Sequence, residues 1–224
     1  MTDGYLWFEG IPFSVVGFSS EVLKEACAQF VIKDEDTVLV TYPKSGTNWM
    51  IEILCLIHSH GDTKWIRSVP TWDRSPWIET DMGYNLLNER EGPRLMSSHL
   101  PFHLFPKSLF TSKAKVIYVM RNPKDVLVSG YYHRTMMKLC KQPESLEQYF
   151  QWFIQGNGEC FSHIGLCPVL CWPFSYFVVY LFYSSSAHFP HMRESRQLLT
   201  LGVWLISISM LVSSSIHFPV NDII

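Results

Sequence analysis

The chain has 224 residues, of which 47% are hydrophobic and 17% are charged, and its formal net charge is −2 at pH 7. This composition excludes a disordered chain, and the nearly balanced charge excludes a general attraction to nucleic acid, so any anion site must be local. The six cysteines are too few for a disulfide scaffold and the N-terminus carries no secretion signal, so we expect a cytoplasmic protein with reduced thiols.

Strands and helices are predicted to alternate through the first 157 residues. Short apolar runs predict strands at 37–41, 95–99 and 115–120. Longer stretches predict helices at 48–59, 124–138 and 144–155. Strands separated by helices indicate an α/β domain with a mostly parallel sheet flanked by helices. In such sheets, ligands bind beyond the carboxyl ends of the strands.

The first predicted strand runs into a loop with the chemistry of a phosphate site. Residues 41–49 read Thr-Tyr-Pro-Lys-Ser-Gly-Thr-Asn-Trp. Gly46 allows a close backbone approach, the first N–H groups of the following helix point at an anion, and Lys44 adds a full positive charge. Neutral donors come from Ser45, Thr47 and Asn48. The alternative is an ordinary turn in which Ser45 or Thr47 caps the helix. No Walker A loop is present, which disfavours an ATP-dependent kinase.

The other two predicted strands also end at polar residues. Arg121 follows 115–120, with Ser129 about two helical turns further on, and this pair suits a second phosphate group. The alternative is a surface ion pair between Arg121 and Asp125. His99 ends the middle strand and could act as a general base because a histidine pKa lies near neutrality, although a lone histidine is more often structural. Three such groups on successive strand ends favour one shared site.

These segments resemble the cytosolic sulfotransferases over about residues 1–157. Residues 41–49 resemble that family's phosphosulfate-binding loop, 98–101 its catalytic histidine segment, and 115–130 its 3′-phosphate segment. Residues 6–10 and 72–77 further resemble the hydroxysteroid, or bile-salt, branch that acts on alcohols. The implied fold is a P-loop-like parallel sheet flanked by helices.

The resemblance implies a reaction and a set of roles. The donor is 3′-phosphoadenosine 5′-phosphosulfate (PAPS), and its sulfuryl group passes to the hydroxyl of a small apolar alcohol in steroid metabolism, without a metal. His99 takes the hydroxyl proton, and Lys44 stabilises charge on the transferring group. The donor is implied to be held by Lys44, Ser45, Gly46, Thr47, Asn48, Trp49, Arg121 and Ser129. Trp72 and Trp77 are candidates for contact with the acceptor, and plain core packing is their alternative.

The sequence departs from the family after Asn157. The family motif Arg-Lys-Gly-x-x-Gly-Asp-Trp-Lys, which completes the nucleotide site, is absent, and so is the family's C-terminal homodimer segment. The fold is therefore expected to be incomplete at the C-terminus. The alternative function is a catalytically impaired, truncated form that at most binds nucleotide. His133 and Arg134 stand where relatives often have aromatic residues, which argues against a steroid preference.

Residues 158–224 form a divergent apolar tail. They hold only five of the 38 charged residues: Glu159, Arg193, Glu194, Arg196 and Asp222. The abrupt change favours an alternative transcript end as the origin of the tail. Attachment to a membrane through 160–212 is the second interpretation, because 161–183 and 197–212 approach the length that spans a bilayer. The spacing of Cys160, His163, Cys167 and Cys171 matches no standard zinc site, so no metal is predicted.

Overall fold

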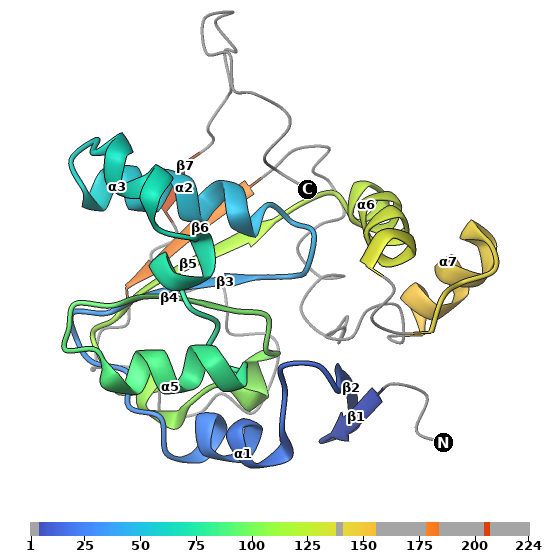
Figure 1. Cartoon of the computed structure of the whole chain (residues 1–224), viewed down its shortest axis with the longest axis horizontal. Helices are drawn as coiled ribbons and strands as arrows, with labels where there is room; N and C mark the ends of the chain where they lie inside the picture. The colour runs from blue at the N-terminus through green and yellow to red at the C-terminus, as the bar shows by residue number, and fades with distance from the viewer. Residues whose placement is uncertain (1–4, 138–140, 156–177, 184–203, 207–224) are drawn as a thin grey trace, which may run out of the picture.

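A five-stranded sheet organises the computed structural model (Figure 1), which describes residues 5–137, 141–155, 178–183 and 204–206. The strand order is β4-β3-β5-β6-β7. The strands are β3 (Thr37–Thr41), β4 (Leu95–Ser98), β5 (Lys115–Met120), β6 (Val178–Tyr183) and β7 (Trp204–Ile206). β4, β3 and β5 are mutually parallel, whereas β6 is antiparallel to β5 and β7 is antiparallel to β6.

The predicted elements of the first 157 residues are confirmed to within two residues. The strands at 37–41 and 115–120 have the expected bounds, and β4 ends one residue before His99. The helices are α2 (Thr47–His58), α6 (Pro123–Met137) and α7 (Leu146–Ile154). The three parallel strands flanked by helices confirm the predicted α/β class.

Several short elements were not predicted. A hairpin of β1 (Tyr5–Phe8) and β2 (Ile11–Ser14) turns through Glu9 and Gly10, both with positive φ. The helices are α1 (Ser20–Ala28), α3 (Thr63–Ser68), α4 (Thr71–Arg74) and α5 (Asp81–Glu89), with 3-10 turns η1 (Phe102–Leu104) and η2 (Lys107–Phe110).

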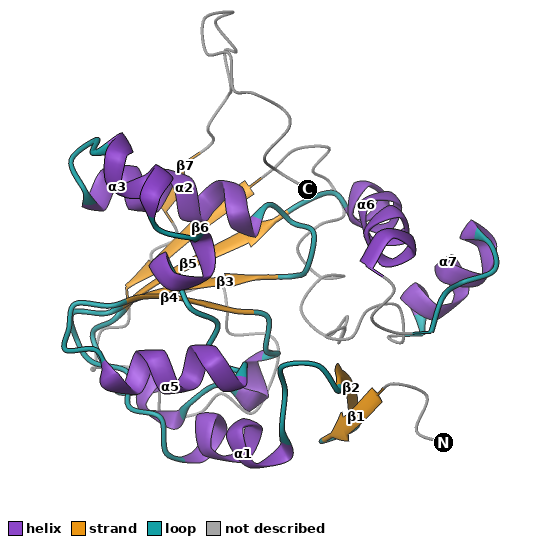
Figure 2. Cartoon of the chain, in the orientation of Figure 1, coloured by secondary structure: helices purple, strands orange, loops and turns teal. Residues whose placement is uncertain are grey.

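Helices cover both faces of the sheet, with α2 and α3 on one side and α1 and α5 on the other (Figure 2). The strand period of two separates the side chains accordingly. Val38 and Val40 pack with the apolar residues of α1 and α5, whereas Leu39 packs with Met50 and Ile51 of α2. The core is therefore two apolar layers, one on each face.

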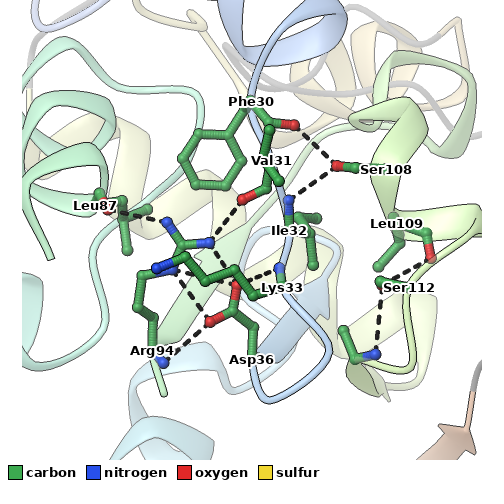
Figure 3. A network of polar contacts seen from close by, with 11 residues as sticks. Phe30, Val31, Ile32, Lys33, Asp36, Leu87, Arg94, Ser108, Leu109 and Ser112 are labelled. Atoms are coloured by element: carbon green, nitrogen blue, oxygen red, sulfur yellow. Dashed lines mark hydrogen bonds and ion pairs between the residues drawn. The ribbon is translucent and has the colours of Figure 1, made fainter. Parts of the chain in front are cut away.

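A buried ion pair fixes where β3 and β4 begin (Figure 3). The Arg94 guanidinium lies 2.5 Å from the Asp36 carboxylate, and both side chains are almost fully buried. Arg94 also donates to the backbone carbonyl oxygens of Val31 and Leu87. Because Asp36 and Arg94 directly precede the two strands, this network sets their register.

The tail predictions fall mostly outside the described residues. Of the two segments considered for membrane attachment, only 178–183 and 204–206 are described, and both are strands paired into the sheet. In the described part of the chain, no helix is both long and apolar enough to span a bilayer. The boundary near residue 157 stays a prediction.

Candidate functional site

The loop after β3 has an unusual backbone. Lys44 has φ +67° and Gly46 has φ +103°, so both lie in the left-handed region. The N-cap residue of α2 is Gly46, which has no side chain, and not Ser45 or Thr47. The alternative in which Ser45 or Thr47 caps this helix is therefore wrong. The positive end of α2 is left facing the loop, as an anion site requires.

His99 lies level with the end of β3 because of the parallel register. Val40 pairs with Ser98, so the next residues, Thr41 and His99, come side by side. The His99 Nδ1 is 2.9 Å from the Thr41 carbonyl oxygen and 3.1 Å from Thr41 Oγ1. A carbonyl oxygen only accepts, so Nδ1 carries the proton and Nε2 keeps its lone pair.

The pKa of His99 differs from the sequence expectation. Burial lowers the pKa of His99 to about 4, the hydrogen bond to the Thr41 carbonyl opposes this, and the charge of Lys44 lowers the pKa further. The assumption of a pKa near neutrality was wrong because it ignored burial and the nearby cation. At pH 7 the imidazole is neutral, so it is available as a proton acceptor.

Two residues that support His99 were missed from the sequence. Glu79 is fully buried, and its Oε1 accepts the backbone N–H of His99 at 2.7 Å. Burial raises the pKa of Glu79 to about 7, against the opposing effect of its hydrogen bonds. Thr41 was noted only as part of the loop, yet its Oγ1 lies 2.7 Å from Thr47 Oγ1. An acidic residue directly after Trp77 and Ile78 was the available signal for Glu79.

Arg121 reaches the loop from the neighbouring strand end. Its Nη1 donates to the Lys44 carbonyl oxygen at 3.3 Å. The alternative pair with Asp125 also forms, at 4.0 Å and with both side chains substantially exposed, so it contributes little to stability. Arg121 and Lys44, 77 residues apart in sequence, are thus brought together.

Helix α6 presents one face to the same loop. Burial and the charge of Lys44 both lower the pKa of His133, which indicates that His133 lies within electrostatic range of the loop. Ser129 lies one turn earlier on this face, where residues four apart are neighbours. Arg134 instead points elsewhere: its guanidinium lies over the rings of Tyr5 and Trp152, at 5.8 and 5.3 Å from their centroids.

The candidate tryptophans occupy different positions. The Trp77 ring centroid is 6.1 Å from that of His99, and the two rings are tilted by 52°. Trp72 lies in α4 with 54% of its surface exposed, and Trp49 in α2 is 45% exposed, as expected of residues that border a site rather than fill a core. Asn48 is also exposed, whereas Ser45 and Thr47 are buried. Trp77 thus lies beside His99 and also packs against the apolar layer of α2, as its core-packing alternative expected. The described ring contacts do not join Trp72 to His99.

Metal-ligating side chains do not cluster within the described residues, where no group of three or more His, Cys, Asp or Glu could hold an ion. The cysteine and histidine spacing at 160–171 lies outside those residues. Cys27 and Cys55 are free thiols, and burial raises the pKa of Cys27 to about 11.

Known proteins resemble this chain over the segments that form the site. A family model described as "Sulfotransferase domain" matches residues 34–166. Sulfotransferase 2A1 of Macaca fascicularis is 65% identical over 167 residues, which are 73% of this chain and 59% of that protein. The 3-beta-hydroxysteroid sulfotransferase of Cavia porcellus is 62% identical over 167 residues, covering 73% and 58%. The chain thus spans about three-fifths of the length of these curated relatives.

Solved structures share the fold. Mouse sulfotransferase SULT7A1, complexed with PAP, superposes with a TM-score of 0.58 at 27% identity, covering 75% of this chain and 56% of that one. Retinol dehydratase, in a complex with retinol and PAP, gives a TM-score of 0.57 at 18% identity, covering 70% and 55%. The second likeness shows a common fold alone.

Proposed function

This chain belongs to the sulfotransferase family, and from that premise we propose that it transfers a sulfuryl group from PAPS to the hydroxyl of a small apolar alcohol, foremost a hydroxysteroid. One observation carries the proposal. His99, held as a neutral base with its Nδ1 proton on the Thr41 carbonyl, stands directly beside the cationic loop that contains Lys44. A base and an anion site at one sheet edge are what this transfer needs.

The donor is proposed to lie in the loop and across to α6. Lys44, the first turn of α2 and the hydroxyls of Ser45 and Thr47 bind its 5′ end, and Trp49 lies against the nucleotide. The donors proposed for the 3′-phosphate are Arg121 and Ser129. The hydrogen bond from Arg121 to the Lys44 carbonyl supports this assignment because it places the guanidinium next to the loop.

The chemical step then needs little beyond positioning and charge. His99 Nε2 accepts the proton of the acceptor hydroxyl as its oxygen bonds to sulfur. The bond from sulfur to the 5′-phosphate oxygen breaks, and its electron pair stays on that oxygen, where Lys44 stabilises the charge. The products are a sulfate ester and adenosine 3′,5′-bisphosphate.

The acceptor class rests on aromatic residues and on the relatives. Trp77 beside His99 offers an apolar surface for a flat alcohol, and the exposed Trp72 is proposed to border it. Relatives named 3-beta-hydroxysteroid sulfotransferase and Sulfotransferase 2A1 support a steroid acceptor. Arg134 packs against Tyr5 and Trp152, and the expectation that His133 and Arg134 disfavour a steroid stays a prediction. The cytoplasmic location expected from the sequence stays a prediction.

Calorimetry with adenosine 3′,5′-bisphosphate tests the site. We expect the full chain to bind it and Lys44→Ala to weaken binding by about tenfold or more, because a charge-assisted contact is lost. Lys24→Ala, an exposed lysine on α1, is the matched control and should bind normally.

Sulfate transfer to a hydroxysteroid then separates the two candidate functions. Transfer that His99→Ala abolishes supports the enzyme, and binding without transfer supports the form that only holds nucleotide. A wild-type chain that binds no nucleotide contradicts both.

A further inference from the structure

We infer that Thr41 is a positioning residue that joins the phosphate loop to the base through a directed chain of hydrogen bonds, from His99 to Thr41 to Thr47. The inference rests on the proposed function, because it concerns the same site. It assigns a role to a residue that neither binds the donor nor touches the acceptor.

The three groups are close, and the two threonines are buried. Thr41 Oγ1 lies 3.1 Å from His99 Nδ1 and 2.7 Å from Thr47 Oγ1. Thr41 is 2% exposed and Thr47 is 7% exposed, so water competes little for these bonds. Thr41 is the last residue of β3 and Thr47 is the first of α2. The hydrogen bond between them therefore joins the two ends of the loop.

The direction of the chain follows from proton counting. The His99 Nδ1 faces the Thr41 carbonyl oxygen at 2.9 Å and must therefore donate. Thr41 Oγ1 can share this proton as a second acceptor, which leaves its own single proton for Thr47 Oγ1. The Thr47 proton is then directed away from Thr41, at the N-terminal turn of α2 where an anion is proposed to sit.

The opposite direction is disfavoured. If Thr47 donated to Thr41 and Thr41 donated to His99, Nδ1 would have to be unprotonated, and its lone pair would face that of the Thr41 carbonyl. An anion that accepts from Thr47 therefore stabilises the direction in which Nε2 of His99 is unprotonated. By linkage, the correct tautomer of His99 in turn favours anion binding.

Three variants separate this role from simple packing. Thr41→Val keeps the shape of the side chain and removes the hydroxyl, whereas Thr41→Ser keeps the hydroxyl. Thr37→Val makes the same change at the opposite end of β3 and is the matched control. Thermal unfolding of each variant verifies that it is folded.

The measurement is the nitrogen spectrum of His99 in the full chain, labelled with ¹⁵N-histidine and assigned through His99→Gln. In the free chain, we expect the Nδ1 signal of Thr41→Val to differ from those of wild type, Thr41→Ser and Thr37→Val, because one of its two acceptors is gone. Identical signals in all four overturn the inference.

The second measurement adds adenosine 3′,5′-bisphosphate. We expect the nucleotide to shift the Nδ1 signal in wild type and in Thr41→Ser, and the shift to be absent in Thr41→Val, whose affinity should fall by about three- to tenfold for the loss of one hydrogen bond. An unchanged affinity and shift in Thr41→Val overturn the coupling. A wild-type chain that binds no nucleotide overturns the proposed function and the coupling, while the free-chain spectra still decide whether Thr41 holds the ring.

Discussion

At the scale of single residues, the site depends on two buried titratable groups with opposite shifts. Burial keeps His99 neutral by lowering its pKa to about 4 and raises the pKa of Glu79 to about 7. Glu79 holds the backbone N–H of His99, so the two groups share one environment. Each resists becoming charged, and their effects on stability have opposite signs with pH.

The sign for each group follows from proton binding. Glu79 holds its proton more tightly in the folded state than in the unfolded state, so its contribution to stability falls as the pH rises from about 4.5 to about 7. His99 binds its proton more weakly in the folded state, so its contribution rises as the pH rises from about 4 to about 6.5. In the wild type these two trends offset each other.

Glu79→Gln should therefore uncover the trend of His99. We expect the free energy of unfolding of this variant to rise with pH between about 4.5 and 6.5 more steeply than that of wild type, by up to about 1.4 kcal/mol per pH unit. Urea unfolding across this range measures it. Glu25→Gln changes an exposed carboxylate on α1 and should leave the dependence of the unfolding free energy on pH as in wild type. The same dependence in Glu79→Gln as in wild type would contradict the opposing effects of Glu79 and His99.

Sequence reasoning proposed the charged and aromatic residues of the candidate site but missed Thr41 and Glu79 as contacts of His99. Lys44, Arg121 and His99 follow recognisable strand ends, so chemistry and position together identified them. Thr41 and Glu79 act through one hydroxyl and one carboxylate oxygen, and their partners lie 58 and 20 residues away. Such pairings appear only once the parallel register is known.

At the scale of elements, strong patterns were predicted and weak ones were missed. The apolar runs of β3 and β5 gave the correct bounds because strands buried on both faces consist almost entirely of apolar residues. The helices α1 and α5 are nine residues long each, with narrow apolar faces. Their caps, Ser19 and Thr80, were the available signals.

Ser19→Ala should destabilise the fold through the N-terminus of α1. Ser19 Oγ accepts the Val22 N–H at 3.3 Å and donates to Asp81 Oδ1 of α5 at 2.7 Å, so it joins the two helices. We expect the free energy of unfolding to fall by about 0.5 to 2 kcal/mol. Chemical denaturation measures it. Ser20→Ala, the next residue along, should have a much smaller effect, and equal losses would argue against the cap.

At the scale of the whole molecule, one polar network ties the starts of two strands to the α1 and α5 side of the fold. Asp36 and Arg94 stand at the starts of β3 and β4, and their bonds extend to the segment before β3 and to the end of α5 (Figure 3). Register set at this end fixes how Thr41 and His99 align at the other. The distant pair thus shapes the site without touching it.

Asp36→Asn tests this long-range role. Removing one partner leaves the Arg94 charge buried and uncompensated, so we expect a loss of about 3 to 5 kcal/mol in the free energy of unfolding. Glu35→Gln changes a neighbouring, exposed carboxylate and should alter stability by less than about 0.5 kcal/mol. Equal stability of Asp36→Asn and wild type in denaturant titration would show that the pair is dispensable.

The left-handed backbone at Lys44 sets stability against function. A lysine with φ +67° is strained by about 1 kcal/mol relative to glycine, which adopts this conformation without steric penalty. Glycine at this position would relax the loop and remove the cation that the proposed chemistry needs. Selection for thermal stability alone would therefore favour glycine at position 44, which raises stability and abolishes anion binding. Engineering of this fold for stability should leave position 44 unchanged.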